Sequence, residues 1–236
     1  MNYENSPVGQ LVLERPARAR VFEQRAIDYC CQGKKTLAQA CEAGAIPLAA
    51  VIDELAASDA NTDANSAAAP AALPTGPVEL IRYILETHHA YLKAELPRLT
   101  ELATKVQKAH GERHPELAAV VVACGELRAD LEPHLLKEEQ VLFPWILELA
   151  SRGGPLPGRP PVQGPIEMME FEHERVGEIL AELRSATAGF VVPSDGCPTY
   201  HAFYEAMARL EADTHQHIHA ENNLLFPMAR RLEAGA

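Results

Sequence analysis

The sequence predicts an all-α protein, in which a small helical N-terminal domain precedes an up-and-down four-helix bundle. From residue 76 onward, apolar side chains recur at alternating steps of three and four, the spacing of a helix face buried in a bundle. No alternating strand pattern appears in the sequence. The motif H-x-x-x-E-x-x-x-L-F-P occurs at His134 and again 83 residues later at His217. A motif repeated in this way predicts two helix pairs that face each other.

The composition argues against several classes of partner. The chain has 236 residues and 47% apolar content, which is enough to bury a core. Its net charge of −12 argues against nucleic acid, whose phosphates attract clustered Lys and Arg, and gives no reason to expect an anionic membrane. The sequence has neither a long apolar run nor the pattern of a signal peptide, so we expect a soluble, cytoplasmic protein.

Residues 1–57 are expected to form the small helical domain. Pro16 can start a helix that runs towards Gly33. Thr36 can cap a second helix, and Pro47 can open a third. So short an all-helical segment can bury only a thin core of its own.

A flexible linker is predicted over residues 58–75, where Leu73 is the only large apolar side chain. The bundle then occupies residues 76–236. Within its second helix, Pro133 removes a backbone hydrogen bond and is expected to kink the helix. The four helical stretches are expected at 77–109, 115–150, 165–187 and 198–233.

The five cysteines include an adjacent pair, Cys30 and Cys31, so a framework of structural disulfides is not expected. The pair has two interpretations. It can belong to an ordinary loop. Alternatively, adjacent thiols near Lys34 and Lys35, beside a helix start, can have lowered pKa values and bind metal, thiol-reactive partners or nitric oxide.

Six polar side chains occupy buried positions of the predicted helix faces. A buried carboxylate without a partner is costly, and a metal site would satisfy all six groups together. In the first helix both His88 and His89 fit the buried face; His173 follows His89 by 84 residues, which favours His89, with His88 as an outer neighbour. The six candidate ligands are His89, His134, Glu138, His173, His217 and Glu221.

Four His and two Glu form a nitrogen and oxygen ligand set that suits metals of borderline hardness. The natural arrangement has two metal ions, each bound by two His, with Glu138 and Glu221 bridging them. About two positions then stay open on each six-coordinate ion. Open positions predict a reactive site for small ligands rather than a structural one.

An alternative ligand set is also present in the sequence. Glu86-x-x-His89 and Glu170-x-x-His173 match the Glu-x-x-His pattern of ferritin-like carboxylate sites. That arrangement would leave two buried His of the other helices without a role, so the two Glu are better explained as surface or outer groups.

A second histidine pair, His215 and His219, has the spacing of a zinc-binding pair on a helix. Neither residue lies on the predicted buried face of the fourth helix. They are therefore better explained as solvated histidines at the rim of the bundle.

With these motifs, the bundle resembles a hemerythrin-like di-iron domain, and the whole chain is similar to the repair-of-iron-centres family (YtfE/ScdA-type proteins). In that family a short domain with adjacent cysteines precedes the bundle, and the resemblance covers essentially the full chain. The motifs that carry it are Tyr-Cys-Cys-x-Gly-Lys-x-Thr-Leu at 29–37, Leu-Pro at 96–97, Lys-Glu-Glu-Gln-Val-Leu-Phe-Pro at 137–144, Met-Glu-x-Glu-His at 169–173, and His-x-x-x-Glu-Asn-Asn-x-Leu-Phe-Pro at 217–227.

The resemblance implies two non-haem irons joined by an oxo or hydroxo bridge. It also implies a catalytic role for Cys30 and Cys31. Carried over to this sequence, the terminal ligands would be His89, His134, His173 and His217, and the bridging ligands Glu138 and Glu221.

The function implied by the resemblance is the repair of iron–sulfur clusters damaged by nitric oxide or oxidative stress. The di-iron centre would bind or reduce nitric oxide, donate iron, or both. The implied partners are nitric oxide, oxygen species and damaged iron–sulfur proteins. A second copy of the chain, in a homodimer, is a further possible partner. The alternative is a hemerythrin-like carrier or sensor of oxygen or nitric oxide without turnover. Oxygen-carrying hemerythrins use a fifth His and an Asp in the second pair, so reversible oxygen transport is not expected.

Overall fold

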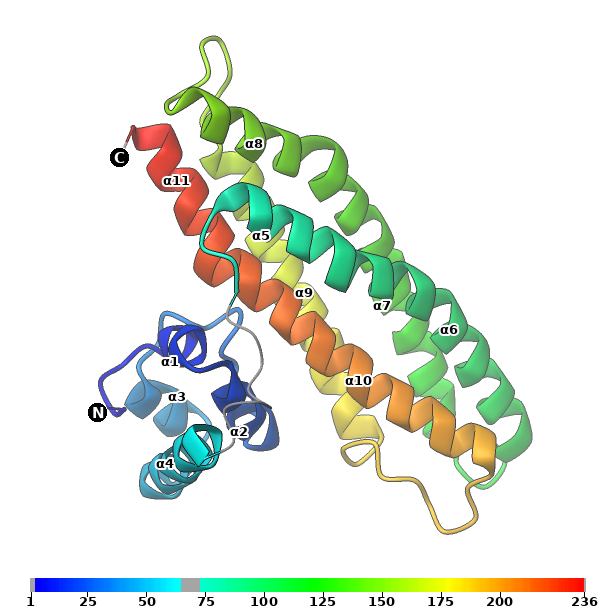
Figure 1. Ribbon diagram of the computed structural model, residues 1–236. Helices are drawn as coiled ribbons and strands as arrows, with labels where there is room; N and C mark the ends of the chain where they lie inside the picture. The colour runs from blue at the N-terminus through cyan, green and yellow to red at the C-terminus, as the bar shows by residue number, and fades with distance from the viewer. Residues whose placement is uncertain (1–2, 65–72, 236) are drawn as a thin grey trace.

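The computed structural model describes residues 3–64 and 73–235, and its regular structure is helical (Figure 1). Within those residues the β-type pairing is limited to an isolated bridge between Pro7 and Thr36. The prediction of an all-α fold is therefore confirmed. None of the described helices is both long enough and apolar enough to cross a membrane.

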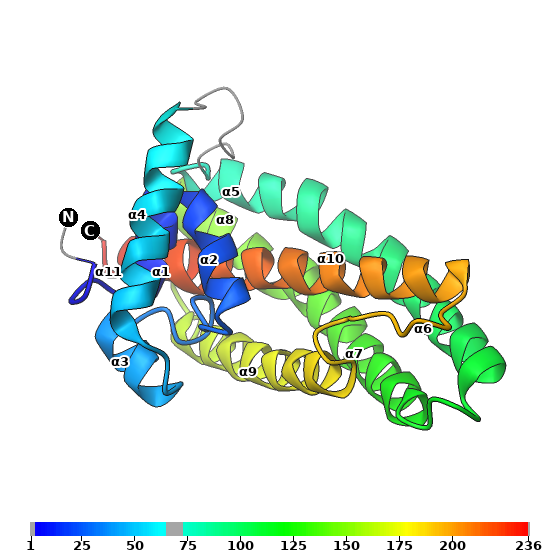
Figure 2. The ribbon, with the colours of Figure 1, turned by 90° about the horizontal axis from the view of Figure 1, so that it is seen from below.

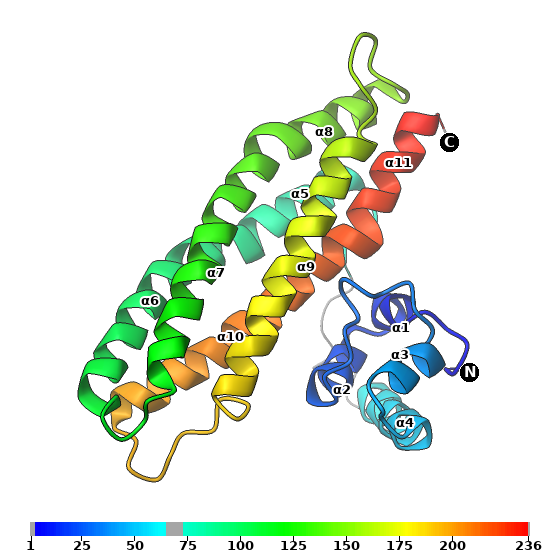
Figure 3. The same cartoon turned by 180° about the vertical axis from the view of Figure 1, so that it is seen from behind.

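Four helical rods build the bundle and pack in the order in which they follow along the chain (Figure 1). Each rod contacts the next one, and the fourth returns to contact the first, as an up-and-down bundle requires (Figure 3). The rods are α5 (Pro77–Ile84), η3 (Leu85–His89) and α6 (Ala90–His110); α7 (Leu117–Lys137), η4 (Glu138–Leu142) and α8 (Phe143–Arg152); α9 (Gln163–Ala186); and α10 (Pro198–Ala220), η5 (Glu221–Leu225) and α11 (Phe226–Ala234).

Turn residues set the ends of the rods. Pro77 and Pro198 each lie at the first helical position, where a missing N–H costs no hydrogen bond. Gly153 ends α8 with a φ of 71°, in the left-handed region that a residue without a Cβ adopts readily. These ends lie close to the predicted boundaries, since the same residues were visible in the sequence.

Two apolar clusters fill the bundle, and a buried polar layer separates them. One cluster lies towards α8 and α11 and includes Ile84, Phe143 and Phe226. The other includes Leu127 and Leu180 and continues into the N-terminal domain. The six predicted ligands lie between the clusters, and each is 1% exposed or less.

In its described residues, the N-terminal domain consists of four helices and a short 3₁₀ turn. Thr36 caps a helix as expected, because its hydroxyl accepts a hydrogen bond from the Gln39 N–H while the Gln39 side chain accepts one from the Thr36 N–H. The elements are α1 (Val8–Glu14), η1 (Pro16–Arg18), α2 (Ala19–Gln24), α3 (Leu37–Ala43) and α4 (Leu48–Ala64).

One helix of this domain is shorter than expected. The helical segment that starts at Pro16 ends at Gln24 rather than Gly33. Ala26 has a φ of 53°, which an α-helix cannot accommodate. Residues 25–35 are therefore a loop, and this loop carries the adjacent cysteines.

Helix α4 is longer than expected and reaches Ala64, so it includes the start of the segment 58–75 that was predicted as a linker. Asp59 accepts hydrogen bonds from Nε of Arg18 at 2.9 Å and from Nη2 at 2.6 Å, which ties α4 to η1. The Ala-rich sequence is compatible with a helix, since Ala is the best helix former. The rest of the predicted linker, residues 65–72, lies outside the described residues.

The N-terminal domain packs against α9, α10 and η5 of the bundle (Figure 2). Nδ2 of Asn223 donates a hydrogen bond to the Cys30 carbonyl at 3.0 Å. The ring of His219 meets Tyr29 edge-on, with 5.3 Å between the centroids. Gly33 is required at this contact, because a Cβ there would lie 2.8 Å from the Tyr29 carbonyl oxygen and would also collide with Oδ1 of Asn223. The packing fixes the cysteine loop over the polar layer of the bundle.

Candidate metal centre

The four rods bring all six predicted ligands into one buried layer. Every rod contributes a histidine, and the second and fourth rods each add a glutamate one helical turn later. The structure brings His89 rather than His88 into the layer. The ligands and their elements are His89 at the end of η3, His134 on α7, Glu138 at the start of η4, His173 on α9, His217 on α10 and Glu221 at the start of η5.

Three of the rods contain a π-helical turn where they supply ligands. The N–H of Phe143 donates to the carbonyl of Glu138, five residues back, and the N–H of Phe226 donates to Glu221 in the same way. The prolines that follow, Pro144 and Pro227, have no N–H to continue an ordinary α-helical ladder. The structure places a widened turn directly before these prolines, a feature that is frequent at functional sites.

The second rod runs on through its internal proline. Helix α7 is continuous from Leu117 to Lys137, so Pro133 does not end it before the ligand His134. The helix continues with a π turn at Glu138, directly after the first ligand turn.

The ligand atoms form two sets that share both carboxylates. The atoms within each set lie within 4.8 Å of one another. We call the set with His89 and His217 site A, and the set with His134 and His173 site B. Glu138 and Glu221 belong to both sites, as a bridging arrangement requires.

Each bridging carboxylate turns one oxygen to each site. Glu138 places Oε2 3.3 Å from Nε2 of His89 in site A, and Oε1 3.3 Å from Nε2 of His134 in site B. Glu221 does the same, with Oε1 3.1 Å from Nε2 of His217 and Oε2 3.2 Å from Nε2 of His173. Ligand atoms about 2.1 Å from one ion and at right angles would be about 3 Å apart, so these separations match the edges of a coordination shell.

The hydrogen bonding of the layer also fits bound cations. Among the described residues, both carboxylate oxygens of Glu138 and of Glu221 are buried without a hydrogen-bond partner, and so are Nε2 of His89 and of His217. Buried polar atoms of this kind are costly in a folded protein. A pair of cations between the rods satisfies all of them, so the residues present fit such a centre.

The charges of the layer favour cation binding. Burial would raise the pKa of Glu221, but the adjacent His217 and His173 outweigh it and hold that pKa well below its usual value. Burial opposes a charge on His134, yet Glu138 and Glu172 raise its pKa to about 10, so a bound metal ion has to displace a proton from this ring. The carboxylates are therefore anionic at neutral pH, the form that binds a metal.

Three of the four ligand histidines are held by an outer hydrogen bond from Nδ1. The acceptor is Glu139 for His89 at 2.8 Å, Glu172 for His134 at 2.9 Å and Asn222 for His173 at 2.9 Å. Such bonds fix the tautomer and leave Nε2 free to bind the metal. Sequence reasoning missed these partners, although Glu139, Glu172 and Asn222 each stand next to a ligand in the chain.

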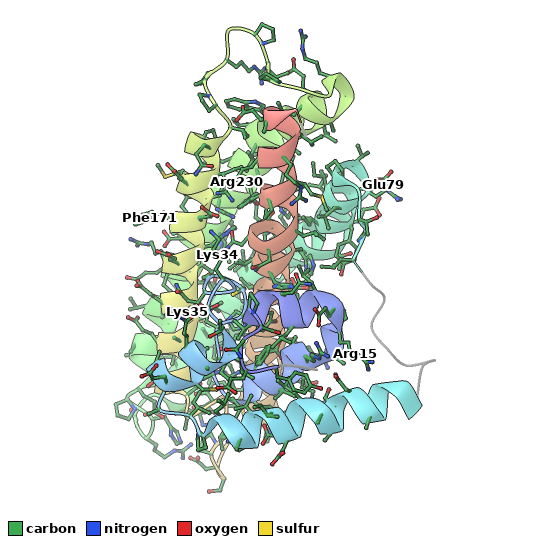
Figure 4. All side chains as sticks on the ribbon, turned by 90° about the vertical axis from the view of Figure 1, so that its left-hand side faces the viewer. Arg15, Lys34, Lys35, Glu79, Phe171 and Arg230 are labelled. Atoms are coloured by element: carbon green, nitrogen blue, oxygen red, sulfur yellow. The ribbon has the colours of Figure 1, made fainter. Side chains whose placement is uncertain are left out.

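Glu86 and Glu170, which we interpreted as surface or outer groups, lie on the surface. Glu86 is exposed, and Glu170 pairs with Arg230 at 3.1 Å on the surface (Figure 4), so both are surface groups. His88 is an outer neighbour as expected: it stacks on His217 with 5.7 Å between the centroids and hydrogen-bonds Asp213 at 3.0 Å.

His219 is not the solvated histidine that we expected. It is 3% exposed and lies in the contact between the two domains, with Nδ1 3.4 Å from the Tyr29 carbonyl. Burial lowers its pKa to about 4, so it is neutral there. The expectation failed because the face of α10 opposite the bundle core is covered by the N-terminal domain.

The adjacent cysteines lie beside the metal layer, although no feature of the sequence placed them there. The Cys30 carbonyl receives a weak hydrogen bond of 3.5 Å from Nδ2 of Asn222, whose Oδ1 accepts from the ligand His173. The expectation of a lowered thiol pKa is wrong for Cys30. Its hydrogen bond with the Cys31 thiol, together with burial, raises the pKa of Cys30 well above the usual value.

Comparison with known proteins agrees with this site. A model described as the hemerythrin HHE cation binding domain matches residues 80–229, and a model of a domain of unknown function, ScdA_N, matches residues 4–59. The iron-sulfur cluster repair protein YtfE of Escherichia coli O157:H7 is 33% identical over 231 residues, which cover 97% of this chain and 98% of that protein. Proteins of the same name from Edwardsiella ictaluri and Cronobacter sakazakii are each 33% identical with the same coverage.

The fold and the site together define a hemerythrin-type cation-binding protein. Because the similarity extends over nearly the whole of both chains, this chain belongs to the repair-of-iron-centres family of YtfE-type proteins. The resemblance seen in the sequence motifs is thereby confirmed.

Proposed function

We propose that this protein repairs iron–sulfur clusters damaged by nitric oxide or oxidative stress, by means of a non-haem di-iron centre at sites A and B. The observation that carries the proposal is the pair of half-sites with shared carboxylates, in a chain whose relatives of the same length are named iron-sulfur cluster repair proteins. In this assignment Glu138 and Glu221 bridge the irons, and the four histidines of sites A and B are terminal ligands.

The ligand set supports iron and open coordination. Histidine nitrogen and carboxylate oxygen suit iron, and the absence of cysteine sulfur from both ligand sets disfavours a cluster or a structural zinc. Two irons bound there, with an oxo or hydroxo bridge, would supply open positions for nitric oxide or oxygen species. The residues of this chain hold the ions apart from bulk solvent, since all six are buried.

The two domains have different tasks in this proposal. The bundle holds the irons, because every ligand lies beyond residue 76. The N-terminal domain presents Cys30 and Cys31 beside site B, where iron or nitric oxide can be handed to or from a damaged protein. A simple oxygen or nitric oxide carrier has no use for such a dithiol loop, so its position favours repair over a carrier or sensor.

The test is restoration of a [4Fe–4S] dehydratase that has been inactivated with peroxide or nitric oxide. Iron-loaded protein should restore dehydratase activity faster than a ferrous salt at the same iron concentration. The Glu138→Ala/Glu221→Ala variant should not, while Glu86→Ala, which changes an exposed glutamate on the first rod, should behave as the wild type. Restoration by ferrous salt alone at the same rate would contradict the proposal.

A second variant separates repair from simple binding. Cys30→Ala/Cys31→Ala should keep the irons and their absorption spectrum, because neither thiol is in a ligand set of the bundle. It should lose most of its ability to restore the dehydratase. If this variant repairs as well as the wild type, the thiols take no part in repair.

A further inference from the structure

The cysteine loop holds three potential metal ligands that belong to neither half-site. The side chains of Asp28, Cys30 and Cys31 offer a carboxylate oxygen and two sulfurs, and these atoms lie within 4.8 Å of one another. Oδ1 of Asp28 accepts hydrogen bonds from the N–H of Cys30 at 3.0 Å and of Cys31 at 2.8 Å. These bonds fix the turn, so both thiols stand beside the same carboxylate.

The distance between the two sulfurs suits one bound metal ion. Their separation is 3.8 Å, nearly twice the length of a disulfide bond of about 2.05 Å. Two thiolates bound to a tetrahedral ion at about 2.3 Å would lie about 3.8 Å apart. The two sulfur atoms are therefore already at the separation that a single chelated metal ion requires.

The surroundings of the loop are open and acidic. A cleft of about 410 Å³ and a second pocket of about 120 Å³ both reach Cys30, Cys31 and Glu174. Of the basic groups along them, Arg184 is neutralised by a hydrogen-bonded pair with Glu211, and Lys34 approaches from the N-terminal domain (Figure 4). An excess of carboxylates concentrates cations at such a surface.

The loop also connects to site B through one side chain. Nδ2 of Asn222 reaches the Cys30 carbonyl at 3.5 Å, and its Oδ1 accepts from Nδ1 of His173 at 2.9 Å. The backbone of the loop is therefore linked to a candidate ligand of the buried centre through a single side-chain amide.

We propose that Asp28, Cys30 and Cys31 form a separate site for a divalent, thiophilic metal ion, through which iron passes between solvent and the buried centre. The inference rests on the proposed function, since it names the port for the same iron. Binding forms two metal–sulfur bonds and one metal–oxygen bond, releases both thiol protons to solvent and changes no oxidation state. Only three protein ligands bind, so the fourth position stays open for exchange with water or an acceptor protein.

The experiment uses cobalt(II) as the probe and the full chain with its bundle already loaded with iron, under anaerobic reducing conditions. Thiolate ligation gives cobalt a strong near-ultraviolet charge-transfer band, which nitrogen and oxygen ligation does not. We expect one cobalt per chain with this band and no loss of iron. Cys30→Ser/Cys31→Ser should lose the band, and Asp28→Asn should keep the loop's hydrogen bonds yet show the band only at higher cobalt concentration.

Cys197→Ser is the matched control, because Cys197 is another partly exposed thiol outside the loop. It should keep the band. Absence of the band in the wild type, or its persistence in Cys30→Ser/Cys31→Ser, would contradict the proposed metal site on the loop. Iron content measured on the same samples keeps the two proposals apart: a chain that binds cobalt on its thiols but never holds two irons would contradict the di-iron assignment and leave only the metal site on the loop standing.

Discussion

Site A and site B share both carboxylates but differ in what supports their histidines. In site B, both histidines have an outer partner: Glu172 for His134 and Asn222 for His173. In site A, His89 is held by Glu139, while Nδ1 of His217 has no hydrogen-bond partner among the described residues. Outer partners raise metal affinity and fix ligand geometry. We therefore expect site B to hold its metal more tightly than site A.

The partners of the two sites also come from different parts of the molecule. In site A, His217 is packed against the ring of His88, which belongs to the bundle. Site B is linked through Asn222 to the cysteine loop of the N-terminal domain. A change in the docking of that domain is therefore expected to affect site B first.

Removing a shared carboxylate should empty both sites, so that they can no longer be compared. This is the largest effect that we expect. Glu138→Ala or Glu221→Ala takes one ligand from both sites and leaves the remaining carboxylate alone among histidines. Either variant should lose both irons, and metal analysis of the purified protein would show it. A Glu138→Ala protein that retains two irons and an unchanged spectrum would show that this carboxylate does not bridge.

Removing the metal should lower stability without abolishing the fold. The metal-free layer buries carboxylate and imidazole groups that have no partners among the described residues, and ions that bind only the folded chain stabilise it by mass action. At a thousandfold excess over the dissociation constant the gain is about 4 kcal/mol, which corresponds to about 10 °C in melting temperature for a chain of this size. Calorimetry during stepwise loading would test it, and equal melting of the loaded and metal-free forms would place the metals outside the core.

Single histidine variants should separate the two sites. His217→Ala removes a ligand of site A only, and His173→Ala a ligand of site B only. Each should leave about one iron per chain, which metal analysis would count, and the iron that stays with His217→Ala should be the harder of the two to remove with a chelator. Equal resistance of the two remaining irons to the chelator would contradict the difference between the sites.

The sequence predicted which residues form the buried layer, because the candidate ligands recur at fixed spacing. The 83-residue repeat and the helical period put His134, Glu138, His217 and Glu221 on buried faces, and the structure brings them together. The π turns were not predicted, since the Phe-Pro pairs after each glutamate are equally compatible with a simple bend. The outer partners were missed because a group next to a ligand in sequence lies on a different face of an ordinary α-helix.

The position of the cysteine loop could not be predicted, because it depends on contacts between distant segments. Tyr29 and Cys30 meet residues 219–223 through hydrogen bonds across about 190 positions of sequence, and no local pattern encodes such pairing. The glycine that permits the contact, Gly33, is visible in the sequence but is equally explained as the end of a helix.

The smallest effect should come from the outer partners, and two adjacent asparagines allow it to be resolved. Asn222→Ala removes the acceptor for His173, and the affinity of site B should fall by about 10- to 100-fold while site A changes less. Asn223→Ala is the control, because the side-chain amide of Asn223 donates to the Cys30 carbonyl at 3.0 Å and lies 3.2 Å from His219, which is not a candidate ligand. Competition with a chelator of known affinity, in the His217→Ala background that retains site B alone, would measure both. If Asn223→Ala weakens metal binding at site B as much as Asn222→Ala does, docking of the N-terminal domain sets the affinity of site B. The hydrogen bond from His173 to Asn222 would then not be the cause of tighter binding at site B.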